Sequence, residues 1–189
     1  MKQSKQKFGF TLIELLMVIA IIGILAGILI PSVGAVRKQA NIAASKSQLS
    51  NYVTAIQMFK GEYGYFPFSD AQVDSGKLVN NITDDFIETL SGRNTAGAVV
   101  TTGGNRRSIA FHSFSASEFF LNDNDTIDDT TLADRFNNTN IYIVIDDDGD
   151  NEVTVPKTIG GGTKEIKTSV TAYVTENSNL GAPAYYLYD

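Results

Sequence analysis

Three aspartates in the last third of the chain have the spacing of cation ligands. Asp146, Asp148 and Asp150 follow a β-branched run, and Gly149 and Asn151 beside them tolerate the backbone conformations of a tight turn. If the turn curls, the three carboxylates converge on one point. Calcium prefers roughly six to eight oxygen ligands, and the first half of an EF-hand loop uses this alternate spacing. The run therefore predicts a calcium site.

The rest of a calcium ligand set is less complete. Counting from Asp146, the place of the bidentate glutamate in a full EF-hand is taken by Lys157. Glu152, or a distant carboxylate such as Asp128 or Asp189, would have to complete the shell. Calcium is the one cofactor that the sequence suggests, and an acidic turn without metal is the alternative.

Glu14 is the only ionisable residue between Phe10 and Ile30. As a helix, these 21 residues would be about 32 Å long, which matches the roughly 30 Å hydrocarbon core of a bilayer. A carboxylate inside a membrane helix costs several kcal/mol, so Glu14 is a functional-site hypothesis by default. A plain membrane anchor would leave this residue unexplained.

The residues before the apolar stretch predict its orientation. Lys2, Lys5 and Lys7 precede it without any acid, so the N-terminus is expected in the cytoplasm and everything after Pro31 is expected to be exported. A cleaved secretory signal is the alternative, but its apolar core spans only about 7–15 residues and ends at a small-residue site that is not evident here.

No catalytic group is readable from the sequence. The chain has no cysteine, which also rules out disulfides, and His112 is its only histidine. His112 has no metal-ligand partner nearby in sequence, so a structural or exposed role is expected. We therefore predict that the protein is not an enzyme.

The N-terminal run GFTLIELLMVIAIIGILA, residues 9–26, resembles the start of type IV prepilins and of the pseudopilins of type II secretion systems. The resemblance implies cleavage after Gly9 by a prepilin peptidase and N-methylation of Phe10. It also implies that Glu14 attracts the terminal amine of a neighbouring subunit during assembly. The segment around Pro31 is then expected to lose helical structure when the subunit joins a filament.

This resemblance predicts a structural subunit of a type IV-like filament, most similar to the major pseudopilin of a type II secretion system. Its expected partners are further copies of itself, prepilin peptidase, an inner-membrane assembly platform with its ATPase, and lipid before assembly. The predicted calcium site also fits this resemblance, because several major pseudopilins carry a calcium site in the C-terminal sheet region. The alternatives are a type IV pilin for adhesion, motility or DNA uptake, and a membrane-anchored binding module that does not polymerise.

The predicted exported part is acidic. Of 15 bases, three are the lysines of residues 1–9, which leaves 12 bases against 21 acids. Eleven of those acids lie between Glu118 and Glu152, where Arg135 is the only base. Such a surface repels the phosphates of nucleic acid, so no nucleic-acid partner is expected.

The pattern predicts an α+β fold of the pilin kind, in which a long N-terminal helix packs on a small C-terminal antiparallel β-sheet. Apolar residues at steps of three and four after Pro31 indicate that the membrane helix continues as an amphipathic one. We expect a single-pass inner-membrane protein whose C-terminal domain is periplasmic or extracellular. Its expected parts are a cytoplasmic leader (1–9), a transmembrane helix (10–30), the amphipathic half of that helix (31–62) and the exported domain (63–189).

The shorter elements follow from local signals. A short helix is expected with Thr83 as its N-terminal cap and Gly92 as its stop, and Ser115 to Glu118 has the spacing of a capping box. A strand is expected over 108–114, whereas 123–129 is interpreted as a solvated loop. The remaining expected strands are those on either side of the 146–151 turn, as a hairpin or a comparable connection, and those at 166–175 and 184–188.

Overall fold

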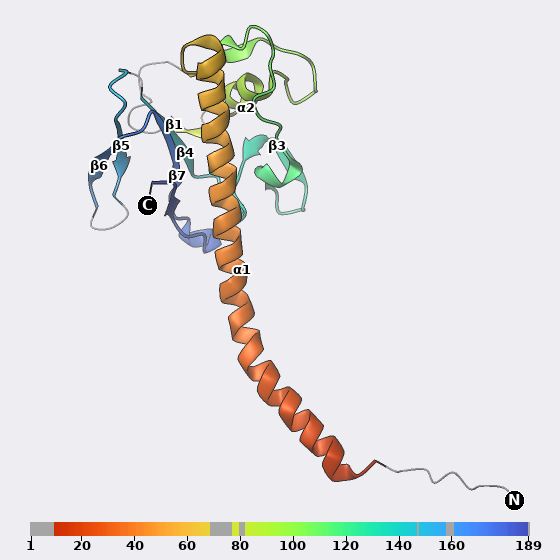
Figure 1. The fold of residues 1–189 in the computed structure, drawn as a ribbon. Helices are drawn as coiled ribbons and strands as arrows, with labels where there is room; N and C mark the ends of the chain where they lie inside the picture. The colour runs from red at the N-terminus through yellow and green to blue at the C-terminus, as the bar shows by residue number, and fades with distance from the viewer. Residues whose placement is uncertain (1–9, 69–76, 80–81, 147, 158–160, 189) are drawn as a thin grey trace, which may run out of the picture. The chain divides into compact units, whose positions relative to one another are not determined.

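The computed structural model describes residues 10–68, 77–79, 82–146, 148–157 and 161–188. By their contacts, residues 1–40 and residues 41–189 form two compact units. One long helix, α1 (Leu12–Tyr63), starts in the first unit and ends in the second. After it come short helices and short antiparallel strands (Figure 1), so the α+β class with a long N-terminal helix is confirmed.

The first unit contains the apolar part of α1. Its most apolar 18-residue window has a mean hydropathy of 2.9, and none of that window is buried within the protein. The exposed apolar side chains here range from 46% exposed at Val18 to 83% at Leu12. Length and composition would let this helix cross a membrane, a criterion that a signal sequence also meets.

The second unit is built on the last part of α1. Leu49, Tyr52, Ile56 and Phe59 recur at helical spacing and are each at most 1% exposed, so one face of the helix is entirely buried. The helix ends at Tyr63 because Gly64 takes a φ of +80°, in the left-handed region that favours glycine.

A four-stranded antiparallel sheet packs on this helix. Its order is β1 (Lys77–Leu78), β4 (Ile141–Ile145), β7 (Val170–Val174) and β8 (Tyr185–Tyr186). Ile141, Ile143 and Ile145 alternate along β4 and share one core with Leu49 and Tyr52 of α1. The predicted final strand (184–188) is present over two residues as β8, and it forms an edge of the sheet.

The opposite face of the sheet carries a second core. A separate hairpin of β5 (Val153–Pro156) and β6 (Thr163–Ile166) covers it, with Val144 of β4 and Tyr173 of β7 packed against the hairpin valines. Of the two alternatives predicted for the acidic turn, the hairpin is wrong, because β4 pairs with β7 and β5 pairs with β6, and the other strand connection is the one present. The acidic turn instead leads from one sheet to the other.

The strand predicted over 108–114 does not form. The amides of Phe111 and His112 both donate to the carbonyl of Leu90, at 2.8 and 3.0 Å, at the end of α2 (Thr83–Ser91). The fully buried Asn105 donates to Thr89 and Ile109 carbonyls, which holds the segment in an irregular path. The aromatic residues Phe111 and Phe114 of this segment pack against the core without strand pairing.

The remaining local predictions hold in part. Gly92 ends α2 with a φ of 68°, although Thr83 is the first helical residue rather than the cap. The capping box forms at Ser115 and Glu118 around the short helix η3 (Ala116–Glu118). The predicted loop 123–129 is only partly a loop, because its last three residues belong to β3. The remaining elements are β2 (Phe119–Leu121), β3 (Ile127–Leu132), η2 (Thr102–Gly104) and η4 (Ser178–Leu180).

Candidate functional site

Glu14 forms a reciprocal cap at the start of α1. Its Oε2 accepts hydrogen bonds from the amide of Thr11 at 2.8 Å and from the Thr11 hydroxyl at 2.6 Å. The Glu14 amide donates to Thr11 Oγ1 at 3.3 Å in return. This is a capping box, which satisfies amide donors that have no partner inside the helix. The capping role of Thr11 was not predicted from the sequence, although its three-residue spacing from Glu14 is the signal of such a box.

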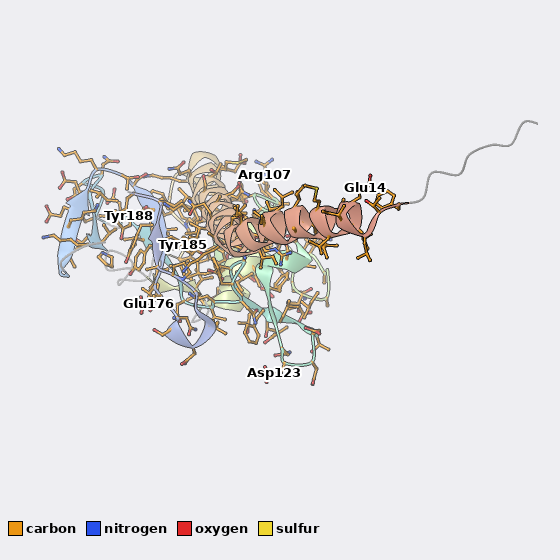
Figure 2. The ribbon with its side chains drawn as sticks, turned by 90° about the horizontal axis from the view of Figure 1, so that it is seen from below. Glu14, Arg107, Asp123, Glu176, Tyr185 and Tyr188 are labelled. Carbon is orange, nitrogen blue, oxygen red and sulfur yellow. The ribbon has the colours of Figure 1, made fainter. Side chains whose placement is uncertain are left out.

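The capping arrangement leaves half of the carboxylate available. Glu14 Oε1 makes no hydrogen bond among the described residues, and it lies at the end of the helix where Phe10 is 77% exposed. Phe10 precedes Thr11 directly, so cleavage after Gly9 would place a new amine one residue from this cap. Gly9 itself lies outside the described residues. Figure 2 shows Glu14 at the start of α1.

Pro31 lies within α1, whose helical assignment continues through this position. A proline removes the amide donor of one helical hydrogen bond. Next to it, the Ser32 hydroxyl donates to the carbonyl of Leu29 at 2.8 Å, a local bond of the kind that competes with helical pairing. Opening of the helix here upon assembly stays a prediction.

The acidic turn curls as its sequence predicts. Gly149 and Asn151 have φ values of 84° and 62°, both in the left-handed region. Asp146 is 2% exposed, and its two oxygens accept the amides of Gly149 at 2.7 Å and Asn151 at 3.0 Å. One carboxylate oxygen each from Asp146, Asp148 and Asp150 lies within 4.8 Å of the others. The turn therefore brings three hard oxygen donors together.

The donor set suits a hard cation. Both oxygens of Asp146 and one oxygen each of Asp148 and Asp150 accept one backbone amide hydrogen bond, and each of these oxygens has a second lone pair. Glu152 is not part of the group of three, and its Oε1 lies 3.5 Å from Lys167 Nζ. Asp128 is also elsewhere, with Oδ1 accepting bonds from the amide and hydroxyl of Thr130. Asp189 lies outside the described residues. A bound cation would thus need water or backbone oxygens to complete its shell.

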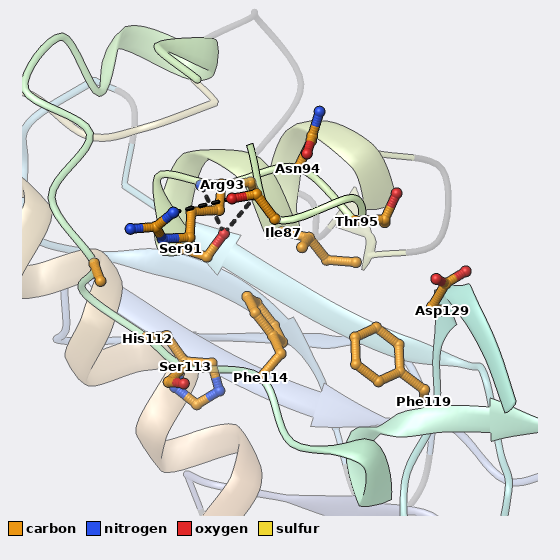
Figure 3. A pocket seen from close by; sticks show the side chains of 12 residues that line it. Ile87, Ser91, Arg93, Asn94, Thr95, His112, Ser113, Phe114, Phe119 and Asp129 are labelled. Carbon is orange, nitrogen blue, oxygen red and sulfur yellow. Dashed lines mark hydrogen bonds between the residues drawn. The ribbon is translucent and has the colours of Figure 1, made fainter. Parts of the chain in front are cut away.

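A cavity of about 340 Å³ lies between α2 and the segment leading to η3 (Figure 3). Phe114 and Phe119 line it from one side and Ile87 from the other. At the rim, the Arg93 guanidinium donates to the Gly97 carbonyl at 2.9 Å. The lining is mainly apolar, and the described residues that form it offer no nucleophile held by a base.

His112 and Glu118 form a buried pair beside this cavity. His112 Nε2 lies 2.9 Å from Glu118 Oε2, and their side chains are only 12% and 10% exposed. Burial raises the pKa of Glu118, but hydrogen bonds from His112, Ser115 and Tyr52 outweigh burial and hold that pKa below its ordinary value. Of the structural or exposed position expected for His112, the structure shows the buried one, whereas its partner Glu118 could not be read from the sequence.

The two adjacent arginines differ in their surroundings. Arg107 forms an ion pair with Glu62 near the end of α1, and its amide donates to the Tyr63 hydroxyl. Arg106 is exposed. Arg107 is thus a salt-bridge partner, while Arg106 belongs to an exposed edge.

Comparison with known proteins supports the N-terminal resemblance. Residues 4–30 match the protein family described as the prokaryotic N-terminal methylation motif. The type II secretion system core protein G of Pseudomonas aeruginosa is 35% identical over 65 residues, which is 34% of this chain and 46% of that protein. The same-named protein of Aeromonas hydrophila is 31% identical over 81 residues, or 43% of this chain and 55% of that protein.

A pilus protein is also similar. The type IV wide pilus major component PilA4 of Thermus thermophilus is 52% identical over 52 residues, which is 28% of this chain and 40% of that protein. The chain spans about half the length of the curated relatives that it matches. No solved structure matches it significantly.

Proposed function

We propose that the N-terminal third of this chain is that of a type IV prepilin or pseudopilin. On that premise, the protein would be a structural subunit of a type IV-like filament, the pseudopilus of a type II secretion system. The observation that carries the proposal is the methylation motif over residues 4–30, with Glu14 at the start of an exposed apolar helix. A buried carboxylate is tolerable mainly when it is paired, and a filament supplies a partner. The protein would therefore have a structural rather than an enzymatic role.

Before assembly, the subunit would span the inner membrane once, with its N-terminus in the cytoplasm. Prepilin peptidase would cut after Gly9 and the new terminus at Phe10 would be methylated. An assembly platform and its ATPase would then move the subunit from lipid into the filament, where the apolar helices pack together. The exposed apolar surface of α1 supports this path, because lipid or neighbouring helices would cover it.

Processing gives the first test. Mass spectrometry of the protein purified from its own cells is expected to show a chain that begins at Phe10 and carries one methyl group on its terminal amine, a net gain of one CH2. Gly9→Leu should block cleavage and leave the full-length chain, because the peptidase site is lost. A wild-type protein that still begins at Met1, or an unmethylated Phe10, would contradict this proposal.

A type IV pilus subunit is the second candidate, favoured by the 52% identity to a pilus component over 52 residues. The genes beside this one would separate the two. An assembly ATPase with an outer-membrane secretin indicates secretion, whereas a retraction ATPase indicates a pilus. A module that does not polymerise would yield no sheared filaments in electron micrographs, and the acidic exported part disfavours DNA uptake.

We also propose that the acidic turn binds calcium and thereby stabilises the exported domain. Calcium at a hundredfold excess over its Kd should add about 2.7 kcal/mol of stability. For a domain of this size, that corresponds to a rise in Tm of roughly 5–10 °C. The rise, measured on the domain from residue 35 onward, should disappear with chelator and in Asp148→Asn.

Asp128→Asn is the matched control for the calcium measurement, because it also removes one acid but lies outside the turn. It should keep the full rise in Tm. A wild-type melting curve that chelator leaves unchanged would contradict calcium binding. The turn would then be held by the hydrogen bonds from backbone amides to Asp146, without metal.

A further inference from the structure

The part of α1 just beyond the predicted membrane span is basic and partly apolar. Between positions 31 and 60 the chain has four bases and no acid. Arg37 and Lys38 are exposed, and neither makes a salt bridge within the part of the chain that the structure describes. Val33 and Val36 are 46% and 66% exposed. Val33 lies three residues before Val36 and four before Arg37, so it neighbours both on the helix surface, and Lys38 flanks them beside Arg37. We call these four residues the basic helix patch.

The β2–β3 hairpin has the complementary character. Asp123 and Asp125 are exposed in its turn, and Figure 2 shows Asp123 at the tip. Leu121 and Ile127 lie opposite each other across the two strands and are 44% and 48% exposed. From position 108 to position 134 the chain carries six acids and no lysine or arginine. We call these four residues the acidic hairpin.

The acidic hairpin is held in shape before any contact. Asn122 and Thr126 join across its turn through a backbone hydrogen bond of 2.9 Å. Along the outer edge of β2, the Asn137 side chain accepts the Leu121 amide and donates to the Leu121 carbonyl, each at 2.8 Å. A preorganised surface loses little conformational entropy on binding, which favours a docking role.

We infer that, in the proposed filament, the acidic hairpin of one copy docks on the basic helix patch of a second copy of this chain. The inference rests on the proposed function, since only a filament brings many copies into a fixed arrangement. Two apolar side chains on each surface would pack together, while aspartates meet the arginine and the lysine. Opposite charges fix partner and register more than they add affinity, and repetition along a filament multiplies a weak contact.

Charge reversal tests this contact in full-length protein in its own cells. Asp123→Lys with Asp125→Lys, or Arg37→Glu with Lys38→Glu, should each lower the amount of sheared filaments at least about tenfold, because like charges then face each other. All four substitutions together restore opposite charges with the signs exchanged. They should bring the filaments back to within about twofold of wild type.

The controls separate this contact from other causes. Arg106→Glu and Glu176→Lys reverse exposed charges elsewhere and should leave filaments unchanged. Equal melting temperatures of all exported domains would show that every variant folds. If wild type forms no filaments, the proposed function fails. If wild type forms filaments but the charge reversals act like the controls, or the fourfold variant does not restore filaments, this contact is excluded. Loss of filaments with the helix substitutions alone would also exclude it and would point to lipid phosphates as the partner of Arg37 and Lys38.

Discussion

Replacing Glu14 by alanine is expected to abolish filament formation while the protein still inserts in the membrane. Insertion depends on the apolar length of the helix, which the substitution increases. Assembly depends on a partner for the terminal amine at Phe10, which would be buried among apolar helices. Breaking a buried ion pair costs roughly 3–5 kcal/mol, which corresponds to at least a hundredfold loss in subunit association. Electron microscopy of sheared filaments, beside membrane fractionation, measures both quantities.

The hydrogen bonds between Glu14 and Thr11 offer a way to separate two roles of this carboxylate. It caps its own helix through Oε2, and it would bind a neighbour's amine through Oε1. Glu14→Gln keeps a group that serves in a capping box but removes the charge. Thr11→Ala removes the capping hydroxyl and keeps the charge.

If charge pairing is the main role of Glu14, Glu14→Gln should abolish filaments and Thr11→Ala should retain most of them. Most filaments should survive Thr11→Ala because loss of a helix cap costs only about 1 kcal/mol. The reverse result would assign Glu14 to helix capping. Normal filaments in Glu14→Ala would remove the residue from the assembly mechanism altogether.

Local chemistry explains which elements could be predicted. The apolar stretch with one acid, the amphipathic continuation of α1 and its end close to residue 62 depend on residues within a few turns of each other. The same holds for the curl of the acidic turn, because Gly149 and Asn151 adopt the left-handed conformations that their types favour. The prediction that three aspartates converge is confirmed in geometry, while the metal stays a prediction.

Contacts between distant residues explain what could not be predicted. The strand expected over 108–114 is replaced by bonds to Leu90 and Asn105, which depend on where α2 ends. Likewise, β4 finds its partner in β7, about 30 residues away, rather than in β5 next to it. Apolar alternation indicates that a segment is half buried, but it does not identify the partner strand.

Glu118→Ala is expected to destabilise the exported domain by roughly 3 kcal/mol. Glu118 is 7% exposed, and one of its oxygens accepts the amide and the hydroxyl of Ser115 at 3.0 and 2.9 Å. The other oxygen lies 2.9 Å from His112. Removing the carboxylate leaves the buried His112 and Tyr52 without this partner. Urea unfolding of the domain from residue 35 onward measures the loss, and the exposed Glu176→Ala should change stability by no more than about 0.5 kcal/mol.

The pH dependence shows whether the charge of Glu118 contributes. Since its pKa is lower in the folded domain than in the unfolded chain, folding favours the ionised form. That contribution is complete above the unfolded value of about 4.3 and is lost as the pH falls through the folded value. The stability gap between wild type and Glu118→Gln should therefore be largest near neutral pH and should shrink below about pH 4. A gap that stays constant with pH would mean that hydrogen bonding and shape, rather than charge, account for the stability that Glu118 provides.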